Sequence, residues 1–287
     1  MENREKRPIH LSPTDRIYRV SIYSFLTFAT VIILFPVLNI VATSFSSYGA
    51  SITGKVWIWP VEVQFQTYKA VFSSNNIFLG YKNTIIYTAA GTMVNLVITV
   101  MAAYALSFPD LKGRNALSIF FAFTMLFSGG IIPTYIVVNR LGLIDTLWAM
   151  VLPGALSVWN MIIMRTFFQN NVPKEMYEAA VIDGCSDIKY LFLCMLPLSG
   201  SILAVIALYY AVGHWNSYFN AMLYLNNKQL YPLQIFLREI LIMNKVTVGT
   251  ITDISALEHK QGLSDIMKYA LIVISSAPLI IAYPFVQ

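Results

Sequence analysis

Charged residues are scarce in this chain, and that scarcity excludes most soluble folds. Asp, Glu, Lys and Arg make up 11% of the 287 residues, whereas hydrophobic residues make up 57%. A soluble domain carries about 25% charged residues. The sequence also lacks the alternating segments of about ten residues that build a membrane β-barrel. It therefore predicts an all-α polytopic membrane protein. The net charge of +5 is ordinary for that class and gives no reason to expect nucleic acid as a partner.

Residues that bind metals or act as nucleophiles are also few. The chain has two cysteines, Cys185 and Cys194, and three histidines, His10, His214 and His259. The histidines lie far apart in sequence and form no ligand cluster, so they predict no metal site. No set of serine, histidine and carboxylate with a usable spacing is visible either. We therefore expect no catalytic residues and no enzyme activity.

A complete phosphate-binding loop is missing as well. Residues 49–55 spell GASITGK, which fits the first seven positions of that loop, but Val56 stands where Ser or Thr would bind Mg²⁺. Residues 57–60, WIWP, follow where a helix should begin. The chain is therefore not expected to bind ATP or another cofactor itself.

Long apolar runs are what the sequence does contain. About 20 apolar residues are needed to cross the hydrocarbon core of a bilayer. Uncharged runs of this length predict six transmembrane helices near 20–45, 84–107, 115–137, 146–167, 197–223 and 268–287. The first run is too long for the core of a signal peptide, so we interpret it as a retained anchor. Gly129, Gly130 and Pro133 suggest that the third span breaks and ends in a short outer helix.

The basic tail, residues 1–19, predicts how these spans are oriented. It holds five Lys or Arg residues beside the first span, and the positive-inside rule keeps such a tail in the cytoplasm. Six spans then return the C-terminus to the cytoplasm, so residues 20–287 are expected to form a single transmembrane domain in the plasma membrane. The loop 168–196 would be cytoplasmic, and loops 46–82 and 224–267 would be external.

Two features of the external loops stand out. Aromatic residues are dense between Lys55 and Asn83, which favours an interfacial belt over a sugar-stacking site. Leu230 to Met243 is predicted to form a short amphipathic helix in the second loop. An outer loop of about 40 residues often binds a partner.

Between the fourth and fifth spans lies a compact charged stretch, Val172 to Pro197. Pro173 suits the first turn of a helix, Gly184 suits the left-handed residue that ends one, and Ser186 suits the cap of a second helix. The stretch therefore predicts a helix, a glycine elbow and a second helix. Because a simple return loop needs only a few turn residues, we expect this longer stretch to bind a partner.

Polar side chains on the fourth and fifth spans are candidates for lining a translocation path. Tyr209, Gly213, Asn216 and Asn220 fall on one face of the fifth span, and Tyr210 flanks it. The full set of candidates is Trp159, Asn160, Tyr209, His214, Trp215, Asn216 and Asn220. Hydrogen bonding between helices, worth about 0.6 kcal/mol per bond, is the alternative explanation for these residues.

The charged stretch resembles a known signature. Glu178-Ala179-Ala180, Gly184 and Leu196-Pro197 match in spacing the EAA motif of binding-protein-dependent ABC importer permeases, although Cys194 stands where that family has Ile or Val. The length and the six spans look like the smaller permease of the maltose-type carbohydrate importers, with the type I importer fold. Residues 127–134 and 231–234 look most like Gram-positive permeases for complex oligosaccharides, including pectin and rhamnogalacturonan fragments.

The resemblance implies several partners and one site. A second, homologous permease would complete the channel as a heterodimer, two ATPase subunits would use ATP and Mg²⁺, and an extracellular solute-binding lipoprotein would deliver an oligosaccharide across the lipid membrane. The external loop 224–267 would enter the sugar cleft of that lipoprotein. The residues implied to couple the ATPases are Glu178, Ala179, Ala180, Asp183 and Gly184. Glu178 would dock on a basic group, the alanines would permit close approach, and Gly184 would form the elbow.

The sequence gives less support to other classes of transporter. A secondary transporter needs acids inside the membrane for ion coupling, and the six predicted spans contain no Asp or Glu. An ABC permease for a non-sugar solute stays open as an alternative, and the lack of a fused ATPase speaks against an exporter. Uronic oligosaccharides would favour cationic groups near the path, yet the spans carry no Lys or Arg away from their ends.

Overall fold

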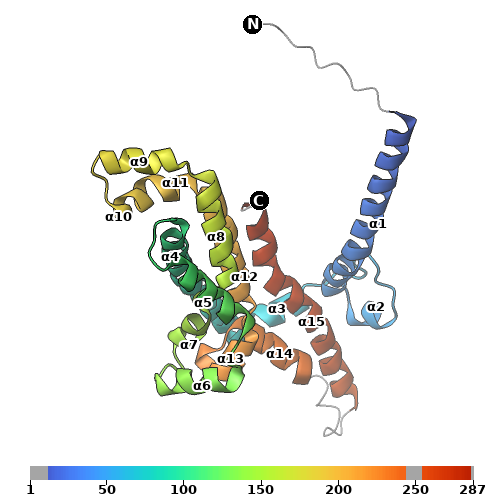
Figure 1. Ribbon diagram of the computed structural model, residues 1–287. Helices are drawn as coiled ribbons and strands as arrows, with labels where there is room; N and C mark the ends of the chain where they lie inside the picture. The colour runs from blue at the N-terminus through green and yellow to red at the C-terminus, as the bar shows by residue number, and fades with distance from the viewer. Residues whose placement is uncertain (1–11, 244–253, 286–287) are drawn as a thin grey trace. The chain divides into compact units, whose positions relative to one another are not determined.

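The computed structural model describes residues 12–243 and 254–285, and all regular elements in these ranges are helical (Figure 1). The chain forms two compact units. One comprises Met1–Lys69 with Ile251–Val273, and the other comprises Ala70–Thr250 with Ile274–Gln287. The prediction of an all-α protein is confirmed for the described residues.

The first unit is built around α1, Pro13–Ser44, whose apolar side chains are mostly exposed. A helix that is apolar on all sides needs lipid or another protein around it. Its end is fixed by local polar contacts, because the Asn39 side chain donates to the carbonyls of Val56 and Trp57. The short α2, Tyr48–Ile52, follows, and α3, Gln66–Phe72, leads out of this unit.

The second unit is organised on α4, Asn75–Ser107, which contacts α8, α12 and α14. Its other helices, in chain order, are α5 Arg114–Leu126, α6 Ile131–Arg140, α7 Leu147–Val151, η1 Leu152–Gly154, α8 Val158–Asn171, α9 Lys174–Ile182, α10 Asp187–Tyr190, η2 Leu191–Met195, α11 Leu196–Leu198, α12 Gly200–Trp215, α13 Tyr218–Tyr224, η3 Lys228–Leu230 and α14 Leu233–Met243. The long α15, Ile254–Ala282, and η5, Tyr283–Phe285, end the described chain.

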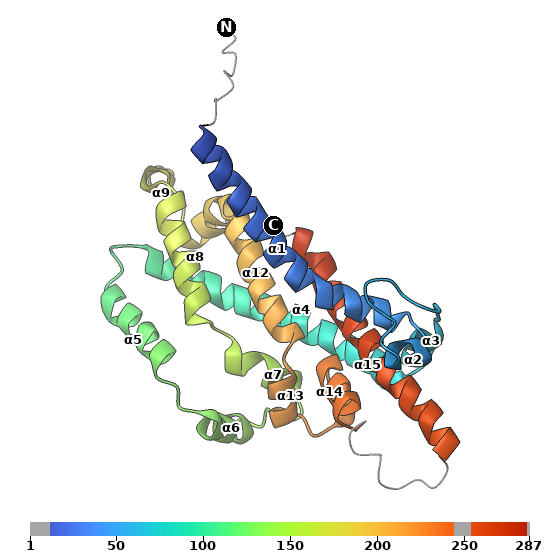
Figure 2. The same cartoon turned by 90° about the vertical axis from the view of Figure 1, so that its right-hand side faces the viewer.

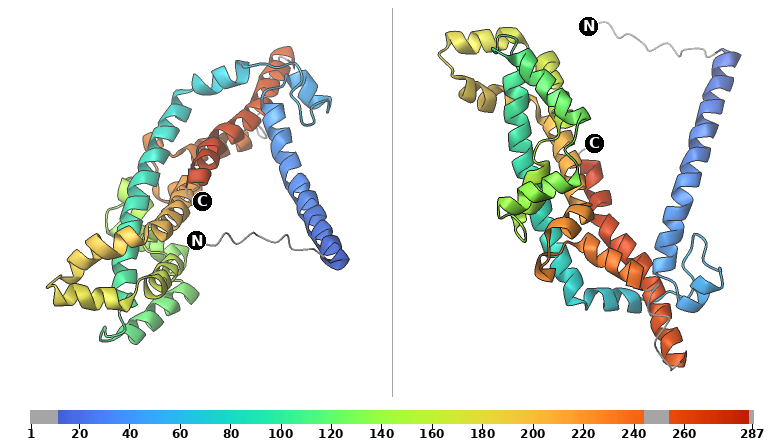
Figure 3. Two further views of the ribbon diagram at one scale, coloured as in Figure 1. Left: turned by 90° about the horizontal axis from the view of Figure 1, so that it is seen from above. Right: turned by 60° about the horizontal axis from the view of Figure 1, so that its bottom comes forward.

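The core of the second unit lies where α4, α8 and α12 meet. Ala103, Met161, Met164 and Ile206 are almost completely buried there, together with Tyr190 from α10. Within this unit, α9, α10 and α11 lie at one end of α8 and α12, whereas α6, α7, α13 and α14 gather at the other end (Figures 1 and 2). Both views of Figure 3 show the yellow hairpin of α9 and α10 projecting from its end of the second unit, away from α6, α7, α13 and α14.

The predicted spans fall on helices, but several of these are interrupted. By length and composition, the described residues contain two helices that could each cross a membrane, α1 and α4, or up to five if each bent pair forms one span. The pairs are bent by 112° between α5 and α6, by 58° between η1 and α8, and by 86° between α11 and α12. A shorter apolar segment, Ile266–Ala282, covers most of the sixth prediction.

The break at Gly129 and Gly130 was predicted, but the other two were not. Pro153 has no N–H and begins a 3₁₀ turn, after which the Ser157 side chain caps α8 by accepting from the Asn160 N–H. Pro197 follows the π-helical turn η2, and α12 then starts afresh after Ser199. The fifth predicted span is also interrupted at Asn216 and Ser217, between α12 and α13. Other differences lie at the ends, because α4 begins at Asn75 and α15 is already helical at Ile254, inside the loop predicted to extend to residue 267.

Candidate functional site

The elbow, residues 173–196, has the local structure that its sequence predicts. Helix α9 ends in a Schellman arrangement, in which the Gly184 N–H donates to the Val181 carbonyl at 3.0 Å and the Cys185 N–H to the Ala180 carbonyl at 2.9 Å. Gly184 has a φ of +73°, in the left-handed region that favours glycine. The Ser186 side chain then caps α10 by accepting from the Lys189 N–H. Two short helices therefore meet at a turn whose geometry is fixed by the backbone.

The elbow is tied to the end of α4. The Tyr104 hydroxyl donates to the Asp187 carbonyl at 2.8 Å, and the Tyr177 hydroxyl donates to the Asp187 carboxylate at 2.8 Å. The rings of Phe108 and Tyr177 are 4.8 Å apart. The hydrogen bond to Asp187 raises the pKa of Tyr177, because ionisation of the hydroxyl would break it. Two hydrogen bonds and a ring contact thus join the elbow to the end of α4.

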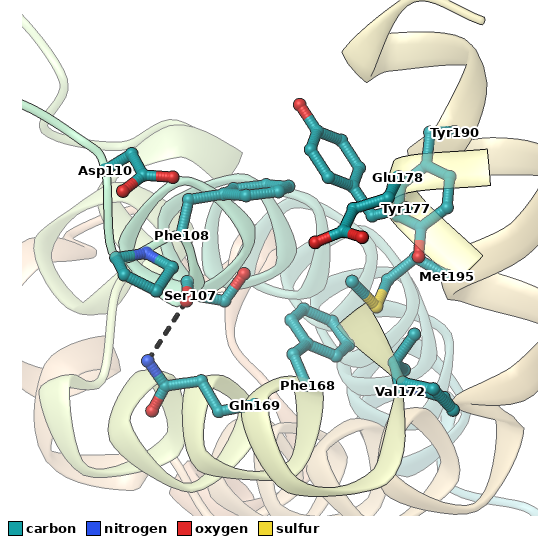
Figure 4. A pocket seen from close by; sticks show the side chains of 12 residues that line it. Ser107, Phe108, Asp110, Phe168, Gln169, Val172, Tyr177, Glu178, Tyr190 and Met195 are labelled. Atoms are coloured by element: carbon teal, nitrogen blue, oxygen red, sulfur yellow. Dashed lines mark hydrogen bonds between the residues drawn. The ribbon is translucent and has the colours of Figure 1, made fainter. Parts of the chain in front are cut away.

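A pocket of about 540 Å³ opens between the elbow, the end of α4 and the end of α8. Figure 4 shows its lining, which includes Phe108, Phe168 and Tyr177, and in which the Glu178 side chain points into the space. Asp110 lines the opposite side, so the lining holds two carboxyl side chains. Gln169 donates to the Ser107 carbonyl at 3.1 Å and closes the floor. An apolar pocket with two carboxylates suits a basic side chain of a partner.

Apolar side chains are exposed at the tip of the elbow. Ile182 is 85% exposed, and Val181 and Ile188 are also largely exposed. Asp183, Gly184 and Ala179 are exposed beside them, whereas Ala180 is half-buried. Exposed apolar residues rimmed by charges are typical of a protein interaction surface. The five residues predicted for coupling therefore lie together on one projecting element.

The candidate path residues divide into two groups. Trp159 and Tyr209 are 58% and 52% exposed, Asn216 is exposed, and Asn220 is half-buried. Asn160 and Trp215, by contrast, are buried, and the Trp215 indole donates to the Ser275 carbonyl at 3.0 Å. The face predicted from Tyr209, Gly213 and Asn216 is exposed along α12 and its C-cap, but Asn220 lies on the separate helix α13, so the single face predicted for all four residues ends at Asn216.

A polar network joins α12 to α4 on the opposite side. The Asn95 amide lies 3.0 Å from Nε2 of His214 and donates to the Gly154 carbonyl at 3.3 Å. One turn along, the Tyr210 hydroxyl lies 2.6 Å from the Thr99 hydroxyl and accepts from the Ser157 N–H at 3.0 Å. His214 and Tyr210 therefore brace the broken fourth span, as the helix-bonding alternative predicted.

The other end of α4 holds the start of α14. The Asn83 amide donates to the carbonyls of Gln229 and Tyr231, at 2.8 and 3.0 Å, and the Thr84 hydroxyl accepts from the Leu233 N–H at 2.9 Å. The amphipathic helix predicted at residues 230–243 is confirmed by α14. Residues 244–253 of the same predicted loop lie outside the described residues.

Sequence reasoning missed three groups that the structure brings to these sites. Phe108 and Asp110 complete the pocket of the elbow, and Arg238 of α14 lies over the ring of Tyr218 at 5.7 Å. The only sequence sign for the first two was the charged turn after the second predicted span. No feature of the sequence indicated Arg238, because the position of its side chain depends on how α14 packs.

Several known proteins are similar to this chain over nearly its whole length, although no family model matches it. The polygalacturonan/rhamnogalacturonan transport system permease protein YtcP of Bacillus subtilis (strain 168) is 37% identical over 273 residues, which cover 95% of this chain and 94% of YtcP. Protein LplC of the same organism is 40% identical over 284 residues, covering 99% and 95%. A chain in the crystal structure of a bacterial ABC transporter involved in the import of the acidic polysaccharide alginate has 32% identity and a TM-score of 0.85, covering 98% of this chain and 99% of that one.

Proposed function

Because this chain belongs to the carbohydrate ABC transporter permeases, a family of transport subunits rather than enzymes, we propose that it forms half of the channel of an ATP-driven oligosaccharide importer. YtcP is named for polygalacturonan and rhamnogalacturonan, and the similar structure belongs to an alginate importer. Both names support a complex oligosaccharide as the cargo, and the two Bacillus relatives support a Gram-positive plasma membrane. A second permease, two ATPases that use ATP and Mg²⁺, and a solute-binding lipoprotein complete the transporter.

The proposed topology has six spans with both termini in the cytoplasm. Residues 1–19 form a basic cytoplasmic tail, and residues 20–287 act as one permease domain. The elbow then lies in the cytoplasm and α14 outside. The arrangement of the second unit supports this, since the elbow and α14 lie at opposite ends of the helices around α4 (Figure 1).

The elbow is the proposed coupling element. Its tip, with exposed Val181, Ile182 and Ile188, docks on an ATPase subunit, and Glu178 receives a basic side chain in the pocket that it shares with Asp110. Closure of the ATPase dimer on ATP pulls the elbow inward. Because the elbow follows the end of α8 at Val172 and leads through α11 and the bend at Ser199 into α12, its movement reorients both helices.

The proposed path runs along the exposed face of α12 and includes Trp159 of α8 and Asn220 of α13. Trp159, Tyr209, Asn216 and Asn220 present rings and amides, which a hydroxyl-rich solute needs as it sheds water. Asn160, His214 and Trp215 are internal to the bundle as described, so they would support the path from behind. Movement of the elbow would turn this face toward the outside and then toward the cytoplasm.

The observation that carries the proposal is the hydrogen-bonded junction between the elbow and α4, made by Tyr104, Tyr177 and Asp187. It is tested by uptake into proteoliposomes that contain the complete transporter, with oligogalacturonides and neutral oligosaccharides as cargo. Uptake should require ATP inside the proteoliposomes and the lipoprotein outside them. Uptake that instead follows an ion gradient without ATP would overturn the proposal in favour of a secondary transporter.

A further inference from the structure

The structure assigns to Arg238 a role for which the sequence offered no candidate. We infer that Arg238, held over Tyr218 at the outer end of the proposed path, binds the carboxylate of an acidic oligosaccharide and selects uronate-bearing cargo. This inference rests on the proposed function and goes beyond it, since it names the residue that recognises the charge of the oligosaccharide. Four observations carry it.

The first observation is the geometry of the guanidinium group. Cζ of Arg238 lies 5.7 Å from the centroid of the Tyr218 ring, within the range of a cation–π contact. A guanidinium group has five N–H donors, and a contact of its carbon with one ring does not occupy all of them. One N–H group contacts the sulfur of Met222, a weak acceptor that a carboxylate readily replaces. The N–H groups can therefore bind a carboxylate with two parallel hydrogen bonds.

The second observation is that Arg238 has no anionic partner. Among the side chains that the structure describes, no carboxylate pairs with it, and its side chain is exposed. Glu239 follows it directly on α14, but adjacent residues of a helix point to different sides and do not face each other. The positive charge is therefore available to an incoming anion.

The third observation is that the helix carrying Arg238 is held rigidly. A Cβ atom on Gly80 of α4 would lie 2.8 Å from the Phe236 ring and 3.0 Å from Cα of Leu233, so only glycine permits this close approach. Thr84 accepts from the Leu233 N–H at the start of α14. A site fixed on such an element loses little conformational entropy when it binds a ligand.

The fourth observation links Arg238 to the proposed path. Gln234 lies one turn before Arg238 on α14, and its amide donates to the Asn216 side chain at 3.4 Å. Asn216 belongs to the exposed face of α12, and Tyr218 begins α13 directly after it. A sugar passing along Asn216 therefore meets the guanidinium group within one helical turn. The path acquires a cation although the predicted spans carry none away from their ends.

The selection follows from charge and shape together. An acidic sugar presents a planar carboxylate to the N–H groups of Arg238 while Asn216 and Gln234 bond to its hydroxyls. A neutral sugar makes the hydroxyl contacts alone and leaves the guanidinium group unpaired. The difference should appear as a preference for acidic cargo of about tenfold, the factor that one such pair commonly supplies.

The test uses the complete transporter in proteoliposomes, with trigalacturonate and its fully methyl-esterified, neutral counterpart as probes. For each variant, the rate of sugar uptake is divided by the ATPase rate measured with the lipoprotein in the absence of sugar. Arg238→Gln should lower trigalacturonate uptake by about tenfold, and Arg238→Lys should recover part of it, since lysine keeps the charge without the fork geometry. Arg140→Gln, an exposed arginine at the end of α6 and outside the loop 224–267, is the matched control and should stay within about twofold of the parent. The yield of purified complex verifies that each variant assembles.

Each outcome decides one of the two proposals. If Arg238→Gln changes uptake no more than Arg140→Gln does, or lowers uptake of the ester as much as uptake of the acid, the role of Arg238 is overturned. A parent transporter that carries the ester but not the acid also overturns it, while the proposed function stands. Where the parent carries trigalacturonate but not its ester, trigalacturonate uptake by the three variants decides whether Arg238 has the proposed role. A parent that carries neither probe nor any neutral oligosaccharide overturns the proposed function, and the role of Arg238 with it.

Discussion

Gly91 of α4 lies so close to the ring of His214 that a Cβ atom built on the glycine would be 2.4 Å from Nε2. The two helices therefore approach each other at this point with only a hydrogen atom between backbone and ring. The contact also keeps Nε2 at 3.0 Å from the Asn95 amide. A small residue at Gly91 is thus the condition for the polar network that braces the broken fourth span.

Gly91→Ala should destabilise the transporter by about 1–3 kcal/mol, the usual cost of overpacking a tight core. In a His214→Ala background the same change should cost much less, because the ring has gone. Gly213→Ala is the matched control, since nothing lies within 4 Å of its Cβ position. Alanine also favours a helix there. Thermal unfolding of the purified complex measures all four variants, and equal costs of Gly91→Ala in both backgrounds would contradict the contact.

Gly184→Ala should weaken coupling between ATP hydrolysis and transport. The position has a φ of +73°, which costs a residue with a Cβ atom roughly 1–2 kcal/mol and favours a different turn. Gly200→Ala is the control, because Gly200 has free space around it and no positive φ. The ratio of sugar imported to ATP hydrolysed should fall for Gly184→Ala and hold for Gly200→Ala. An unchanged ratio in both would remove Gly184 from the coupling mechanism.

Glu178→Arg should separate ATP hydrolysis from uptake more severely than Glu178→Gln. The arginine places a positive charge where we propose that a basic ATPase side chain enters, whereas glutamine removes only the attraction. Asp110→Gln tests the other carboxylate of the pocket and should have a smaller effect, because Asp110 lies outside the elbow. Co-purification of the ATPase subunits with the permease provides the binding readout. Full uptake with Glu178→Arg would exclude this pocket as the docking point.

The elbow could be predicted from the sequence because its signals are local. Pro173, Gly184 and Ser186 each specify one backbone conformation, and the structure has a helix start, a left-handed residue and a cap at these positions. The predicted spans fall on helices for a similar reason, since charges mark their ends. Local chemistry of this kind needs no knowledge of which helices touch.

The breaks in the fourth and fifth spans and the site at Arg238 depend on tertiary contacts. Pro153 lies in an uncharged run, where proline is compatible with either a kinked or a broken helix. The side chains that stabilise the break, Asn95 and Tyr210, lie on distant helices. Arg238 reaches Tyr218 only because Gly80 lets α14 approach α4 closely. None of these contacts leaves a periodic pattern in the sequence.

The last prediction concerns Asp145, whose carboxylate accepts the backbone N–H groups of Asn226 and Asn227 and so holds two loops together. These hydrogen bonds hold the pKa of Asp145 below its usual range, so the contact is present above about pH 4 and is lost as the pH falls through the lowered pKa. Asp145→Asn tolerates the positive φ of this position but lacks the charge. Amide hydrogen exchange at residues 226 and 227 should therefore be faster in Asp145→Asn than in the parent at neutral pH. The difference, expressed as a ratio at each pH, should shrink below about pH 4 as the parent carboxylate becomes protonated. A ratio that stays constant across this range would show that the charge of Asp145 does not hold the loops.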